Sequence, residues 1–280
     1  CNYLGLRSSV DFRYWGLFME EGGGHNLHSW IPFSLWKTHP EYWCLIDGKR
    51  QHPNAYKNQI CLSNPEGKKI FVGRWLDFIE HTPQAKKADC LNLKIEDNWG
   101  SCECPECLRP IRLPDGSLLH KDDIAFRSTE FFQFLNEVAN TAHNHGYPNL
   151  QIGTYVYFFT VPVPKIPVSS YIRPYFCDYV RKDQKQPIFA PINDLWWRTL
   201  NEWTKVSKRV VIREYTGLYV YFRPLAEVAA WDIRAELDAG AMEFTSESLP
   251  ECSSESDSES ARQFDVSAME YWVITRLYWD

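Results

Sequence analysis

Segments typical of strands and of helices alternate along this chain after residue 60, and this order restricts the fold more than any other feature of the sequence. Each apolar run that indicates a strand is followed by a stretch whose apolar residues recur at helical spacing. We expect strands at 90–96, 149–159, 169–177, 208–215 and 240–244, and helices at 65–80, 127–145, 190–205, 222–237 and 261–278. Repetition of strand and then helix predicts a parallel sheet, either closed as a barrel or open and doubly wound.

Capping residues mark the ends of two of these helices. Asn64 is suited to cap the helix at 65–80, and Pro65 fits its first position because the fixed φ of proline is already helical. Ser128 is expected to cap the second helix at its start. Gly146 is expected to end it, since glycine readily adopts the backbone conformation found after helix C-termini.

The segment CLNLKIEDNWGSCECPEC, residues 90–107, carries the most chemistry in the sequence. An apolar strand pattern ends there in two adjacent acids, Glu96 and Asp97. Barrel and open α/β enzymes present their catalytic groups at the carboxyl ends of strands, so this position is typical of a catalytic acid. The alternative is that the two acids only terminate the strand and solvate its end.

Three cysteines follow within six positions, at Cys102, Cys104 and Cys107. They could supply three thiolates to a structural zinc, but the sequence shows no fourth ligand, and such sites usually have four. A disulfide within the loop is the other form of bracing. The chain has 9 cysteines, an odd number, so they cannot all pair within it. We predict no cofactor, with a structural zinc as the alternative, and we favour bracing of the loop over catalytic thiol chemistry.

The composition of the chain limits which partners and which class of protein are expected. The formal net charge is −6 and no basic run is dense, which argues against nucleic acid as a partner. No apolar run is long enough for a membrane span. Aromatic residues make up 15% of the chain, and they can fill a core or stack on sugar rings. Because the chain begins with Cys1, we expect a processed chain or a piece of a longer one with further domains.

We expect one domain over residues 1–280, with a loop-rich part at 1–60 and an exposed, acidic, serine-rich loop at 246–260. Several phrases, taken together, resemble the mostly bacterial domain-of-unknown-function family 4838, a group similar to glycoside hydrolases. The phrases are GGGHNLHSW (22–30), HPEYWCLIDGKR (39–50), QICLSNPEG (59–67), EDNWGSCECPEC (96–107) and AMEF (241–244).

This resemblance implies an α/β fold, a (β/α)8 barrel of the TIM type. Because fewer than eight strands are countable in the sequence, we expect the barrel to be incomplete at the N-terminus of this chain. It also implies a secreted or periplasmic hydrolase that cleaves glycosidic bonds in a glycan or oligosaccharide. Family members often carry Asn-Asp-Asn or Gln-Asn-Asp where this chain has Glu96-Asp97-Asn98, so Asp97 is the acid that the resemblance carries over. Gln-Gly usually follows the late strand, whereas Phe244 and Thr245 follow Glu243 here.

Glycosidic cleavage usually needs two carboxyl groups, one to protonate the leaving oxygen and one to act as base or nucleophile. Glu96 or Asp97, Glu214 and Glu243 are acids at the ends of separate expected strands, and a barrel would bring them to one face. We predict Glu243 as the nucleophile or base and Asp97 as the proton donor. The alternative for Glu214 is a pair with Arg213, and for Glu243 a cap on the following loop.

The expected sugar contacts come from loops and strand faces. His25 follows three glycines, whose backbone can approach a ligand closely, although a loop histidine is often only exposed. Trp99 is the best candidate for stacking on a sugar ring. Tyr155 and Tyr157 alternate along one strand face and point the same way. The remaining expected contacts are Asn98 and Arg173, the latter able to bind an acidic sugar or to form a structural ion pair.

Two other functions fit the same residues. One is a carbohydrate-binding module derived from a glycosidase barrel, which would use Trp99, Tyr155 and His25 without a matched pair of acids. The other is a zinc enzyme built on the cysteine cluster, which requires an open metal position and a nearby base.

Overall fold

The computed structural model describes residues 20–21, 24–178, 183–215, 226–246, 273 and 276–277. Contacts divide the chain into two compact units, one of residues 18–174 and one of residues 1–17 with 175–280. The expected closing helix at 261–278 and the acidic loop from residue 247 onward lie outside the described residues, apart from single positions near the C-terminus. That residues 1–280 form one domain stays a prediction.

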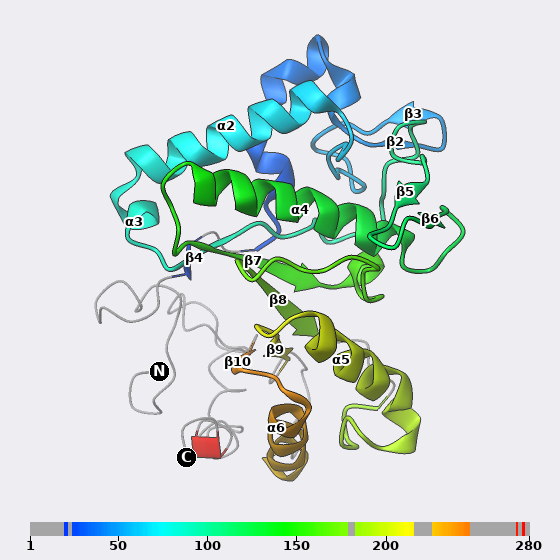
Figure 1. Cartoon of the computed structure of the whole chain (residues 1–280), viewed down its shortest axis with the longest axis vertical. Coiled ribbons are helices and arrows are strands. Elements are labelled where there is room, and N and C mark those ends of the chain that lie inside the picture. Colours follow the sequence, from blue (N-terminus) through cyan, green and yellow to red (C-terminus); the bar gives the residue numbers. More distant parts are fainter. Residues whose placement is uncertain are drawn as a thin grey trace, which may run out of the picture. The chain divides into compact units, whose positions relative to one another are not determined.

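The unit of residues 18–174 is built on parallel strands. Strands β1 (Glu20–Glu21), β4 (Cys90–Asn92) and β7 (Gln151–Val156) lie in that order, and each pair is parallel (Figure 1). Asn92 is level with Gly153, and the Leu93 N–H donates to the Gly153 carbonyl at 2.9 Å. The pairing of β4 with β7 therefore continues past the last residue of β4, toward the acids.

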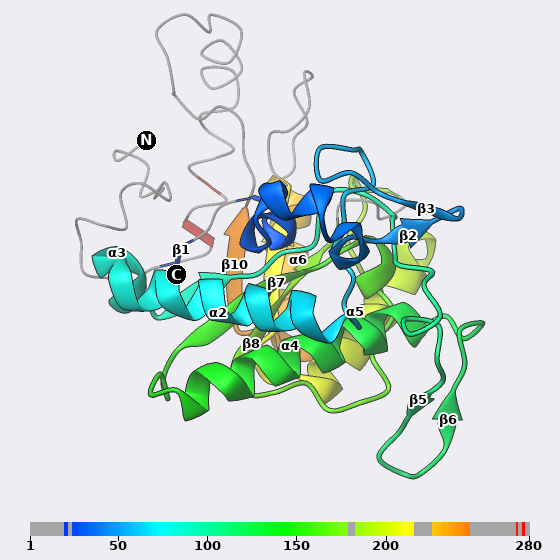
Figure 2. The same cartoon turned by 90° about the horizontal axis from the view of Figure 1, so that it is seen from above.

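Two long helices of this unit lie side by side along its strands, as Figures 1 and 2 both show. They are α2 (Pro65–His81) and α4 (Phe126–Asn144), and a short helix, α3 (Pro83–Lys86), follows α2. The rings of Phe71 in α2 and Phe134 in α4 meet edge to face at 5.2 Å. Both rings are buried, so the helices share one apolar layer.

The capping prediction is confirmed for α2 and wrong for α4. The Asn64 side chain accepts a hydrogen bond from the Gly67 N–H at 2.8 Å, and Pro65 is the first helical residue. Ser128 lies inside α4 instead of before it, buried, with its hydroxyl donating to the Thr160 carbonyl at 3.3 Å. The chain enters α4 through a turn at Asp123, whose carboxylate accepts the Ala125 N–H at 2.8 Å.

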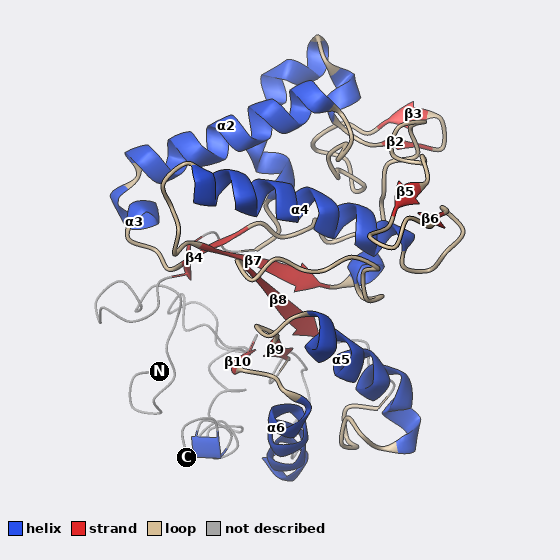
Figure 3. Ribbon diagram, in the orientation of Figure 1, coloured by secondary structure: helices blue, strands red, loops and turns tan. Residues whose placement is uncertain are grey.

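Gly146 has a φ of +104° just after the end of α4, as expected for a residue that stops a helix. The loop-rich part of this unit consists of short elements, which Figure 3 shows by type. They are the 3₁₀ helices η2 (Leu27–Trp30), η3 (Phe33–Lys37), η4 (Pro40–Tyr42) and η5 (Phe158–Thr160) and the antiparallel pairs β2 (Leu45–Ile46) with β3 (Lys49–Arg50) and β5 (Ile111–Arg112) with β6 (Leu118–Leu119).

The second unit also carries parallel strands with helices. Strand β8 (Ile172–Cys177) enters it at Tyr175 and pairs with β9 (Val211–Glu214), which pairs in turn with β10 (Glu243–Ser246). Its helices are α5 (Asp194–Val206), preceded by the 3₁₀ helix η6 (Pro191–Asn193), and α6 (Ala226–Ala239).

The predicted α/β fold with parallel strands is therefore confirmed. Six strands enter parallel pairs among the residues described, and a complete ring of eight is not found there. In the same part of the chain, no helix combines the length and the apolar character that crossing a membrane requires.

Candidate functional site

Polar side chains follow one another along β4 and the residues just after it. Asn92, Lys94 and Glu96 are all buried, and the residues between them are apolar and buried too. Successive side chains of an extended strand point to opposite faces, so the polar residues share one face. Buried polar groups require partners, so a buried polar face at the end of a parallel strand is typical of a functional site.

Glu96 is held by His28. Only 4% of its side chain is exposed, and its Oε1 accepts a hydrogen bond from the His28 backbone N–H at 2.9 Å. The Nδ1 atom of the same histidine lies 2.7 Å from that oxygen. A buried carboxylate is costly unless it has partners, and the His28 N–H provides a hydrogen bond, with the imidazole ring close to the same oxygen.

The backbone of Glu96 is fixed by the side chain of Gln59. The Gln59 Nε2 donates to the Glu96 carbonyl at 3.1 Å, and its Oε1 accepts the Glu96 N–H at 3.2 Å. Gln59 is itself buried. The sequence analysis missed this residue, although its phrase QICLSNPEG had been noted, because nothing local in the sequence links residue 59 to residue 96.

Asp97 faces the other way, and its neighbour is His25. The Asp97 side chain is 66% exposed, and one of its oxygens lies 3.8 Å from the Nε2 of His25. The Nδ1 of His25 hydrogen-bonds to the Ile95 carbonyl, which can only accept, so Nδ1 carries the proton. That bond fixes the ring and leaves Nε2 directed to the acid.

Trp99 offers an aromatic surface two residues after Asp97. Its side chain is 68% exposed, and its ring meets Phe158 edge to face at 5.0 Å. Phe158 has a φ of +49°, which is rare for a bulky residue. Residues with such rare backbone conformations are found more often at functional sites. An exposed ring held in place by a second ring is suited to stacking on a flat ligand.

The two expected tyrosines lie in different surroundings. Tyr155, in β7, is buried, with its ring 5.3 Å from that of His25 and 4.5 Å from the Nζ of Lys94. Tyr157 is half-buried just beyond the end of β7, where its ring centre lies 4.0 Å from that of Phe158. Tyr155 thus belongs to the buried polar face, and Tyr157 to the aromatic group with Trp99.

Asn98 and Arg173 are both buried. The Asn98 side chain is 1% exposed and accepts the Gly100 N–H at 2.9 Å. Its amide also donates to the Asn58 side chain at 3.3 Å. These contacts favour a role in shaping the loop over direct contact with a ligand. Arg173 lies in β8 in the same unit.

The two late acids lie at opposite ends of their parallel strand pair, and this corrects the expectation that both end a strand. Glu214 is the last residue of β9, as expected, whereas Glu243 is the first residue of β10. In register, Glu243 is level with Val211, three residues before Glu214. Glu243 and Glu214 are therefore separated by three residues along the strand direction, which is about 10 Å.

Comparison with known proteins places this chain in a family. Over residues 5–280 it matches the family described as "Domain of unknown function (DUF4838)". The chain belongs to the DUF4838 family. The resemblance inferred from the sequence is thereby confirmed over nearly the whole chain.

No curated protein matches this DUF4838 chain. Among solved structures, it is similar to the crystal structure of the Prevotella bryantii endo-beta-mannanase/endo-beta-glucanase PbGH26A-GH5A, with a TM-score of 0.39 and 8% sequence identity. The similarity covers 95% of this chain and 48% of that chain, so the DUF4838 chain spans about half the length of that protein.

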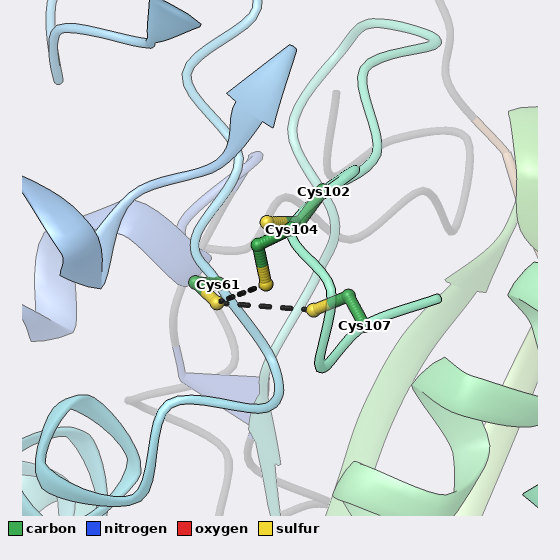
Figure 4. A group of neighbouring side chains, drawn as sticks. All are labelled: Cys61, Cys102, Cys104 and Cys107. Carbon is green, nitrogen blue, oxygen red and sulfur yellow. Dashed lines mark hydrogen bonds between the residues drawn. The ribbon is translucent and has the colours of Figure 1, made fainter. Parts of the chain in front are cut away.

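The DUF4838 chain also brings four cysteines together, and among the residues that the structure describes this group is the one suited to hold a metal. Cys61 lies beside Cys102, Cys104 and Cys107, with all four sulfur atoms within 4.8 Å of one another (Figure 4). The sequence analysis found the three loop cysteines and missed Cys61, which precedes them by about 40 residues and carries no local signal.

Proposed function

We propose that this chain is a carbohydrate-active hydrolase that cleaves glycosidic bonds and uses Asp97 as the proton donor. The observation that supports the proposal is the pair of acids after β4, one buried against His28 and one exposed beside His25. Glycosidic cleavage requires a carboxyl group that can protonate the leaving oxygen, and of these two acids Asp97 is the one exposed to a ligand. The TIM-type barrel and a secreted or periplasmic location, both implied by the family resemblance, are part of the same proposal.

Within this proposal Asp97 is the acid that meets substrate, because it is exposed and Trp99 stands two residues away. Glu96 is the positioning residue, because it is buried and bonded to His28. Glu214 and Glu243 are the candidates for the second acid. Both lie in the other unit; of the two, Glu214 ends its strand, where barrel enzymes carry their catalytic groups, and the variants below test each acid by itself.

A glycan-binding module that does not cleave is the second candidate. It is favoured by the place of Glu243, which starts its strand and so departs from the arrangement of a catalytic acid. Such a module needs the exposed Trp99 and the histidine beside Asp97, but no second carboxylate.

A panel of aryl glycosides and aryl uronides tests the two candidates. The purified chain is compared with Asp97→Asn, Glu214→Gln and Glu243→Gln, and with Asp122→Asn, an exposed acid of the same unit, as the control. Hydrolysis that falls by about 1,000-fold in Asp97→Asn and in one of the glutamine variants, but not in the control, supports the hydrolase. Removal of a general acid typically lowers the rate by about 10²- to 10⁴-fold, so a loss of this size is expected.

The result that overturns the hydrolase is absence of turnover on every substrate while the chain still binds a glycan on an array. If glycan binding in that case weakens in Asp97→Asn and not in Asp122→Asn, the result supports the glycan-binding module. Circular dichroism of each variant verifies that the fold is kept.

A further inference from the structure

Four cysteine side chains from two separate segments converge in the unit of residues 18–174 (Figure 4). Cys61 lies just before α2, and Cys102, Cys104 and Cys107 lie in the loop after β4. The Cys61 sulfur is 3.7 Å from that of Cys104 and 3.8 Å from that of Cys107. All four thiols are buried.

These spacings match a tetrahedral metal centre. With zinc–sulfur bonds of about 2.3 Å, the edge of a regular tetrahedron of sulfur atoms is about 3.8 Å. Since all four sulfur atoms also lie within 4.8 Å of one another, one ion can reach every one of them after small side-chain movements. We propose that Cys61, Cys102, Cys104 and Cys107 bind a structural Zn²⁺ ion as thiolates.

Hydrogen-bond donors directed at the sulfur atoms support this assignment. The Leu45 N–H donates to the Cys102 sulfur at 3.3 Å, and the Arg50 guanidinium lies 4.0 Å from the same atom. Four thiolates and one Zn²⁺ carry a net charge of −2, and such donors outside the ligand shell stabilise it.

A fifth cysteine nearby is not a ligand. The Cys44 thiol donates to the Ile60 carbonyl at 3.1 Å, and its sulfur is not among the four that lie within 4.8 Å of one another. Cys44 therefore provides a matched control, since it is buried beside the cluster but does not belong to it.

Two simpler readings of the cluster are less consistent with the geometry. A disulfide requires a sulfur–sulfur distance of about 2.05 Å, well below those observed. A purely apolar packing of thiols would not require a guanidinium and a backbone N–H at one sulfur atom. The four cysteines complete the usual zinc shell, so the site has no open position for catalysis and differs from that of a zinc enzyme.

The ion would connect the start of α2 to the loop that follows the acids. Cys61 precedes Asn64, the cap of α2, by three residues, and Cys102 follows Trp99 by three. The Glu103 N–H donates to the Leu45 carbonyl at 2.7 Å, so the hairpin of β2 and β3 is attached to the same loop. The site thus braces the base of the loop that carries Asp97 and Trp99.

Metal analysis of the full chain, purified without added chelator, tests the proposal. We expect about one zinc per chain, below 0.2 in Cys61→Ser, and about one in Cys44→Ser. Zinc below 0.2 per chain after expression with added zinc overturns the proposal, as does the same zinc content in Cys61→Ser as in the unmodified chain. Iron as the bound metal overturns the choice of ion.

A second measurement does not depend on whether Cys61→Ser folds. The unmodified chain is loaded with Co²⁺ in place of zinc, and its absorption spectrum reports the ligands. Intense sulfur-to-cobalt charge-transfer bands with the visible bands of a tetrahedral ion are expected. A spectrum without sulfur-to-cobalt bands overturns the proposal.

Discussion

The side chain of Gln59 forms two hydrogen bonds with the backbone of Glu96, donating to its carbonyl at 3.1 Å and accepting from its N–H at 3.2 Å. An amide side chain thereby pairs with the chain at the end of β4 as a neighbouring strand would. Gln59 lies two residues before Cys61. The short segment of residues 59–61 therefore fixes the buried Glu96 through Gln59 and supplies a ligand of the proposed zinc ion through Cys61.

Gln59→Leu is expected to lower the free energy of unfolding by about 1–3 kcal/mol, because it leaves the buried N–H of Glu96 without its partner and its carbonyl with the Asn98 N–H alone. Under the proposed function, glycan turnover or binding falls with it, since the acids follow directly. Urea unfolding at constant m-value measures the change. Gln133→Leu, at an exposed position of α4, is the matched control, and an equal loss in both variants would refute the role of Gln59.

Gly100→Ala is expected to destabilise the chain by about 1–3 kcal/mol through overpacking. A Cβ there would lie 2.8 Å from the Asn98 Oδ1 and 3.1 Å from the Ile46 Cδ1, and both side chains are buried. Gly73→Ala is the control, because Gly73 lies inside α2 with nothing within 4 Å of its Cβ position. Alanine is the better helix former, so that variant is expected to be about 0.5–1 kcal/mol more stable. Thermal unfolding of both variants gives the comparison, and destabilisation by the two alike would contradict it.

Trp99→Ala is expected to weaken glycan affinity at least tenfold, or about 1.4 kcal/mol, while the melting temperature changes little. The ring is 68% exposed, so its loss removes a binding surface rather than core. Ile124→Ala, at an apolar residue that is 82% exposed, is the control for loss of surface area alone. Isothermal titration with a ligand identified on the glycan array measures the effect, and unchanged affinity in Trp99→Ala would remove this residue from the site.

Removal of the proposed zinc by a chelator is expected to lower the free energy of unfolding by several kcal/mol, since binding of a structural ion is also folding energy. The transition should return to its original temperature when zinc is added back, and not when magnesium is added, because thiolates select the softer ion. Calorimetry of the full chain follows both steps. A melting temperature that the chelator does not change would show that the ion has no structural role.

Features set by neighbouring residues could be predicted from the sequence. The start of α2 was correct because its cap and its first residue, Asn64 and Pro65, act locally. The turn of the β2–β3 hairpin had a local signal that the sequence analysis did not use. Asp47 and Gly48 have φ values of +52° and +72°, and Asp-Gly favours such two-residue turns.

Features set by distant residues could not be predicted in this way. Ser128 looked like a cap, but the turn at Asp123 begins α4 earlier and Ser128 bonds to Thr160 instead. Cys61 and Gln59 meet the loop after β4 only in the folded chain. The prediction that Glu243 ends its strand was wrong. A short strand can lie before or after such an acid, and the pairing with β9 places Glu243 at the start of β10.

The proposed zinc site also has an entropic cost, because its ligands lie far apart in the sequence. Cys61 and Cys107 are 46 positions apart in the sequence, and one ion bound to both would close that stretch into a loop. For a cross-link of this span, the chain-entropy relation used for disulfides gives about 4 kcal/mol at 25 °C. The free energy of zinc binding must offset that amount, because the ion binds the folded chain and the loop closes as the chain folds. Helix α2 and strand β4 both lie within the closed stretch, so the ion would tie the ends of the segment that contains them.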